Sequence, residues 1–170
     1  MAKFNITVNE NKKNLKEGNR DYNNFISLGI KDIQKNNLGD AVKNFLNAVD
    51  INSKKFEAFI NLSNVYILQN KIKKGVEVLK EYLAVNNYQI NIVNHLGIIC
   101  LKYNYENDLI ELFKYLDRDL SVDNNKNKFF LYYLQGKFLQ KKNKINYSID
   151  SYKKSINLNS NYLETYIDLL

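Results

Sequence analysis

One pattern of small and apolar residues recurs along this 170-residue chain at a nearly fixed distance. In the segment LGDAVKNFLNAV, residues 38–49, Ala41 and Ala48 flank Phe45 on one face of a predicted helix. The face returns after 34 residues, after 34 more and after a further 39, and its large central residues are Phe45, Leu79, Phe113 and Tyr152. Such a period predicts a stack of helical pairs, because a single pair leaves an apolar face uncovered.

The helix before each copy repeats in step and carries a small residue at its centre. In the first copy Gly29 follows Phe25 and Leu28. A residue without bulk lets two helix backbones approach, and a large residue of the next helix then fills the space beside it. We therefore expect each small residue to lie against the large residue of its own pair. The small residues are Gly29, Ser63, Gly97 and Gly136.

With these residues in place, the sequence resembles a tetratricopeptide (TPR) array. Leu28-Gly29 matches the Leu-Gly of the family's first helix, and Ala41, Phe45 and Ala48 match the small, aromatic and small residues of its second helix. The resemblance implies an all-α fold, a right-handed superhelical α-solenoid of antiparallel helical hairpins. The family's usual Trp and Pro are absent, because the chain contains neither residue.

The register of the repeat sets the predicted boundaries along the chain. A polar N-terminal arm, expected to be flexible, covers residues 1–21; four repeats cover 22–55, 56–89, 90–123 and 129–162; residues 163–170 begin a fifth repeat or form a capping helix. The abrupt end after this start favours a fragment of a longer protein. Residues 124–128, NNKNK, are predicted to form a solvated loop. In the third repeat Leu109 and Leu116 replace small residues, so its packing is expected to deviate.

Asparagines stand at the predicted turn inside each helical pair. Asn tolerates the left-handed backbone conformation that often ends a helix. In the first turn, Asp40 is expected to be the N-cap of the second helix. The asparagines at equivalent places are Asn36, Asn70, Asn104 and Asn143.

The sequence offers little material for catalysis. His95 is the single histidine and Cys100 the single cysteine, five positions apart, so a metal site or a catalytic triad lacks partners. We expect Cys100 to be a buried spacer and His95 a partly exposed helix residue. No glycine-rich phosphate loop is present. The sequence therefore predicts no enzyme, no cofactor and no metal.

Composition narrows the compartment and the partner. One cysteine, no secretory leader and no apolar run of about 18 residues predict a cytoplasmic protein without a membrane span. The net charge is +7, yet only Arg20 and Arg118 among 25 basic residues are arginine, the residue suited to phosphate recognition. Nucleic acid is therefore a less favoured partner, and no small-molecule substrate is evident.

The resemblance also implies where a partner would bind. In TPR arrays the first helix of each repeat lines a concave groove. The face is apolar with interspersed amides, which suits an extended segment or an amphipathic helix. Alternatively, some of the isoleucines pack between repeats or are covered by the N-terminal arm. The predicted groove residues are Asn23, Ile26, Ile30, Ile33, Glu57, Ile60, Asn61, Asn64, Ile67, Asn91, Asn94, Ile98, Leu101, Tyr133 and Lys137.

Three functions follow in order of preference. The first is a non-enzymatic protein-protein interaction module that binds a peptide segment or partner helix in this groove. The second is the N-terminal TPR region of a larger transferase, of sulfotransferase or glycosyltransferase type. The third is RNA binding by helical repeats, which the basic charge motivates. A carboxylate clamp of the kind found in some TPR proteins is disfavoured, because only Asn61 matches its pattern.

Overall fold

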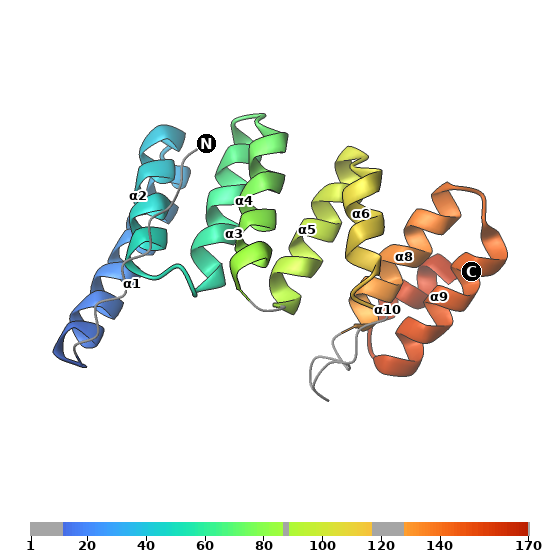
Figure 1. Ribbon diagram of the computed structural model, residues 1–170. Coiled ribbons are helices and arrows are strands. Elements are labelled where there is room, and N and C mark those ends of the chain that lie inside the picture. The colour runs from blue at the N-terminus through green and yellow to red at the C-terminus, as the bar shows by residue number, and fades with distance from the viewer. Residues whose placement is uncertain (1–11, 87–88, 117–127, 170) are drawn as a thin grey trace. The chain divides into compact units, whose positions relative to one another are not determined.

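The computed structural model describes residues 12–86, 89–116 and 128–169, and all regular structure in these ranges is α-helical (Figure 1). The helices are α1 (Lys12–Gln34), α2 (Leu38–Ile51), α3 (Phe56–Leu68), α4 (Ile72–Val85), α5 (Ile90–Tyr103), α6 (Glu106–Phe113), α8 (Phe129–Lys141), α9 (Ile145–Leu158) and α10 (Leu163–Leu169). The predicted all-α class is confirmed.

The chain divides into two compact units between Lys71 and Ile72. The first unit holds α1 to α3 and the second holds α4 to α10. The division therefore falls inside the second predicted repeat, residues 56–89. Because each unit has its own core, each is described by itself.

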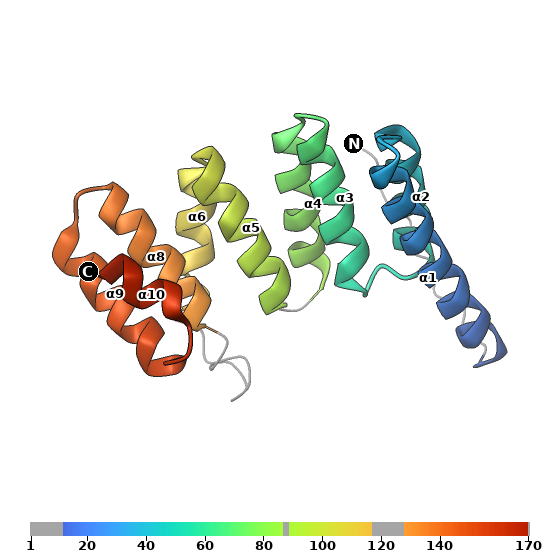
Figure 2. The ribbon, with the colours of Figure 1, turned by 180° about the vertical axis from the view of Figure 1, so that it is seen from behind.

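In the first unit α1 and α2 form an antiparallel hairpin, and α3 packs against α2 (Figures 1 and 2). The side chains of Ala41, Phe45 and Ala48 are fully buried on the inner face of α2. A Cβ atom placed on Gly29 would lie only 2.6 Å from the Phe45 ring. The small residue and the large residue of this pair are in contact, as the sequence predicted.

The hairpin of α8 and α9 in the second unit repeats this arrangement. A Cβ atom on Gly136 would lie 2.4 Å from the Tyr152 ring, which is 1 % exposed. The Tyr152 hydroxyl donates a hydrogen bond to Gln140 at 3.1 Å. The same packing thus holds the first and the last hairpin, with a tyrosine in place of the phenylalanine.

The hairpin of α5 and α6 departs from the predicted packing. Gly97 lies against Leu134 of α8, at 2.6 Å from an added Cβ atom, and not against Phe113. Phe113 is half-buried, and its ring centre is 5.8 Å from that of Phe138. The buried residues of α6 are Leu109 and Leu112, and Leu109 stands where the repeat pattern has a small residue. The predicted contact of Gly97 with Phe113 is therefore wrong. The different packing agrees with the deviation expected for the third repeat.

The turns that follow α1, α3, α5 and α8 each contain one asparagine in the left-handed conformation. Asn36, Asn70, Asn104 and Asn143 have φ angles of 60°, 58°, 62° and 58°. The expected role of Asp40 requires correction, because Asn37 is the N-cap of α2 and Asp40 lies in the first helical turn. There Asp40 pairs with Lys43 at 2.9 Å.

Two predicted segments, the N-terminal arm and the solvated loop, are described only in part. Helix α1 begins at Lys12, so residues 12–21 of the predicted flexible arm are helical; this segment contains no Pro and is rich in residues with good helix propensity. Residues 1–11 lie outside the described residues, as do residues 124–127 of the predicted solvated loop. Lys128, the last residue of that loop, is 8 % exposed and donates a hydrogen bond to the Leu116 carbonyl at 3.0 Å.

Candidate functional site

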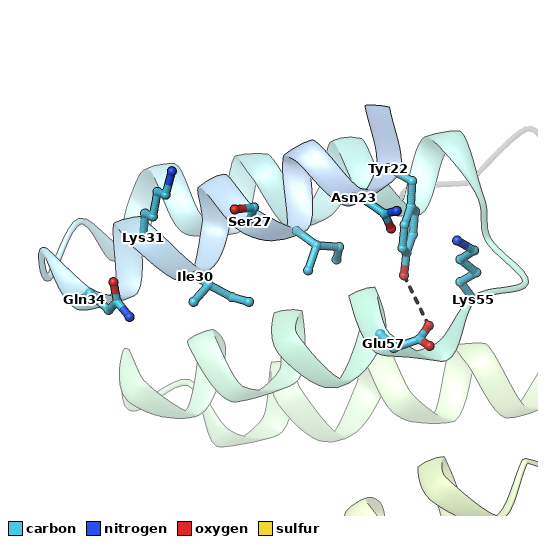
Figure 3. A pocket seen from close by; sticks show the side chains of 9 residues that line it. Tyr22, Asn23, Ser27, Ile30, Lys31, Gln34, Lys55 and Glu57 are labelled. Carbon is cyan, nitrogen blue, oxygen red and sulfur yellow. Dashed lines mark hydrogen bonds between the residues drawn. The ribbon is translucent and has the colours of Figure 1, made fainter. Parts of the chain in front are cut away.

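An open pocket lies along one face of α1 in the first unit (Figure 3). Its volume is about 540 Å³. Seven α1 residues between Tyr22 and Gln34 line it at helical spacing, while Lys55 and Glu57 border it at the start of α3. Four of the predicted groove residues line this pocket: Asn23, Ile26, Ile30 and Glu57. One face of α1 and the N-terminal end of α3 therefore border the same cavity.

Tyr22 fixes the two walls of the pocket relative to each other. Its side chain is 3 % exposed, and its hydroxyl accepts a hydrogen bond from the Ala58 backbone N–H at 3.2 Å. The hydroxyl also lies 3.4 Å from the Glu57 carboxylate, to which it donates (Figure 3). The Lys55 ammonium lies 4.2 Å from the centre of the Tyr22 ring. Sequence reasoning missed Tyr22, although its place just before the first repeat signature was visible.

The open side of the pocket is apolar at its centre and polar along its margin. Ile30 is 42 % exposed and points toward α3, while Lys31 points away from α3 (Figure 3). The side chains of Asn23, Ser27 and Gln34 have no hydrogen-bond partner among the described residues. Such a surface can bury an apolar group and hydrogen-bond a polar one.

The other predicted groove residues of the first unit lie outside this pocket. Ile33 on α1 and four residues of α3 are half-buried, and the latter are Ile60, Asn61, Asn64 and Ile67. Half-burial means that part of each of these side chains is already covered by the protein.

In the second unit the predicted groove residues differ widely in exposure. Asn91 and Ile98 on α5 are exposed, and Leu101 is half-buried. The side-chain oxygen of Asn94 is buried and has no hydrogen-bond partner among the described residues. An open surface is therefore available at only some of these positions.

Helix α10 occupies the surface next to the two predicted residues of α8. Tyr133 is 9 % exposed, with its ring centre 5.2 Å from that of Tyr162. Lys137 forms an ion pair with Asp168 of α10 at 2.9 Å. Burial, together with a hydrogen bond to Asp168, raises the pKa of Tyr133 above its ordinary value. These side chains hold α10 in place.

The surroundings of Cys100 and His95, the two residues considered for catalysis, do not activate either side chain. Cys100 is 1 % exposed, and burial raises the pKa of its thiol to about 12, which keeps it protonated at neutral pH. His95 is half-buried, and burial lowers its pKa. The burial of Cys100 and the partial exposure of His95 agree with their predicted structural roles.

Comparison with solved structures assigns the fold. PilF of Pseudomonas aeruginosa superimposes with a TM-score of 0.68 at 17 % identity, covering 90 % of this chain and 68 % of PilF. MamA gives 0.65 at 14 % identity, with 89 % and 80 % covered. YrrB, described as a TPR protein with an unusual peptide-binding site, gives 0.55 at 15 % identity, with 92 % and 78 % covered. The chain therefore has the TPR fold.

Comparisons of sequence alone identify no relative. No family model matches the chain, and no curated protein matches it. Of the described helices, none has the length and apolarity needed to cross a lipid bilayer.

Proposed function

We propose that this protein is a non-enzymatic interaction module that binds a segment of a partner protein on the exposed face of its first helices. The α1 pocket carries the proposal, because it combines an exposed isoleucine with side chains whose hydrogen-bonding groups lack described partners. These polar side chains are exposed to solvent, and a bound peptide can replace their bonds to water with its own hydrogen bonds while its apolar side chains cover Ile30. The TPR fold supports the proposal, as does the peptide-binding site described for YrrB.

A protein segment fits the pocket better than a nucleic acid does. The pocket lining contains two lysines but no arginine, the residue whose planar guanidinium suits phosphate recognition. The single cysteine is buried, and the raised pKa of its thiol keeps it protonated at neutral pH. We therefore propose no catalytic activity for this protein.

The proposal is tested by selecting peptides from a phage-displayed library of random 12-residue sequences on the full chain. The selected peptides are synthesised, and their affinities are measured by fluorescence anisotropy. We expect Ile30→Glu to weaken binding at least about tenfold, because a carboxylate would be placed against the apolar part of the bound peptide.

Leu28→Glu is the matched control, because Leu28 lies on the same helix, is 38 % exposed and does not line the pocket. It should leave the affinity unchanged. Circular dichroism verifies that both variants keep their helix content. The proposal fails if the full chain enriches no peptide, or if Ile30→Glu binds the selected peptides as well as the unmodified protein does.

A further inference from the structure

The lining of the α1 pocket is specific enough to indicate the chemistry of its ligand. From Asn23 to Gln34 the lining stripe follows α1 for about 16 Å, at about 1.5 Å per residue. An extended peptide of roughly five residues has the same length, at about 3.4 Å per residue. A bound segment of that size would lie in contact with Asn23, Ile26, Ser27, Ile30 and Gln34.

The polar side chains of the stripe favour an extended ligand over a helical one. Asn23, Ser27 and Gln34 lack hydrogen-bond partners among the described residues, and each carries both a donor and an acceptor. A bound helix keeps its backbone groups bonded within itself and offers them nothing. An extended backbone exposes one N–H and one C=O at each residue, which these side chains can pair.

The charges around the pocket are not balanced. Lys31 and Lys55 form no ion pair with any described residue, and the Lys55 ammonium faces the Tyr22 ring. The only carboxylate in the lining, that of Glu57, already accepts a hydrogen bond from Tyr22. A negative group on the ligand would therefore find an unpaired cation at Lys31, on the exposed margin of the stripe.

We propose that this pocket binds an extended peptide segment that places an aliphatic side chain against Ile26 and Ile30 and an acidic side chain at Lys31. The inference rests on the proposed function and adds the conformation and the charge of the ligand. The partner is thus a protein with an exposed segment in which an aliphatic residue stands close to Asp or Glu.

The experiment repeats the library selection with the full-length Lys31→Glu variant. Lys153→Glu on α9 is the charge-matched control, since Lys153 is exposed and does not line the pocket. The unmodified protein and Lys153→Glu should both enrich peptides with Asp or Glu near an aliphatic residue. Lys31→Glu should bind these peptides about tenfold more weakly, and its own selection should favour Lys or Arg at the acidic position.

A second measurement tests the extended conformation. Proline is placed in a selected peptide between its aliphatic and acidic residues, where it is compatible with an extended chain but breaks a helix. Retained affinity supports the inference.

Three results would overturn it. If no peptide is enriched, the proposed function falls and this inference with it. If Ile30→Glu abolishes binding while Lys31→Glu has no effect, the peptide binds in the α1 pocket but does not place an acidic side chain at Lys31. If proline abolishes binding and the apolar residues of the selected peptides are three and four apart, the ligand is a helix.

Discussion

Two glycines determine how closely the helices of the first and the last hairpin approach. Gly29 and Gly136 leave room for the rings of Phe45 and Tyr152, both of which are almost fully buried. Gly39 on α2 is different, because nothing lies within 4 Å of a Cβ atom added there. Identical substitutions at glycines of one hairpin should therefore have opposite effects.

We predict that Gly29→Ala lowers the free energy of unfolding by about 1–3 kcal/mol, because its methyl group would overlap the Phe45 ring. Gly39→Ala should raise the free energy of unfolding by about 0.5–1 kcal/mol, since alanine favours the helix and nothing obstructs it. Urea denaturation followed by circular dichroism measures both. Equal effects at the two positions would contradict the packing of the first hairpin.

At the scale of the element, the turns that follow α1, α3, α5 and α8 share one backbone conformation. Each places a single asparagine at a φ near +60°, where most L-residues are strained. In the first turn, the Asn36 N–H bonds the Ile33 carbonyl at 2.9 Å, and the next N–H bonds the Asp32 carbonyl at 2.8 Å. These bonds satisfy carbonyl groups that the end of α1 would otherwise leave unpaired.

Substitution of Asn36 tests this geometry, because the side chain is exposed and only its backbone conformation is special. Asn36→Gly should keep the free energy of unfolding within about 0.5 kcal/mol of the original, since glycine adopts this conformation without steric cost. Asn36→Val should lower it by about 1–2 kcal/mol, because a branched Cβ atom is strained there. The measurement is again urea denaturation, and a valine variant as stable as the glycine variant would contradict the assigned turn.

At the scale of the molecule, the chain consists of two compact units, one with α1 to α3 and one with α4 to α10. Each contains one tightly packed glycine-aromatic pair, Gly29 with Phe45 and Gly136 with Tyr152. In repeat folds each hairpin contacts mainly its neighbours, so local damage need not spread through the whole chain.

We expect Phe45→Ala, which costs about 3–5 kcal/mol, to reduce the hydrogen-exchange protection of α1 to α3 far more than that of α8 and α9. Tyr152→Ala is the reciprocal variant and should chiefly affect α8 to α10. Hydrogen exchange read by mass spectrometry resolves the two units. A uniform loss of protection after either substitution would mean that the units unfold together.

The sequence predicted the all-α class, the four turn asparagines and the contacts of Gly29 and Gly136 with the aromatic residues of their own hairpins. It could do so because period, small residues and turn residues act within one hairpin, over short distances along the chain. Gly97 shows where this reasoning ends. Its contact comes from Leu134 in the next hairpin, 37 positions along the chain, and the repeat pattern of one hairpin does not specify that contact.

The candidate site shows the same division. Helical spacing alone placed Asn23, Ile26 and Ile30 on one face, and that face lines the pocket. Spacing could not show that Tyr22 would join α1 to the start of α3, or that α10 would cover Tyr133 and pair with Lys137. The sequence by itself therefore determined the repeat, its turns and the packing faces of the first and the last hairpin. Only the tertiary structure decided which helical faces stay open, because exposure depends on neighbours that are distant along the chain.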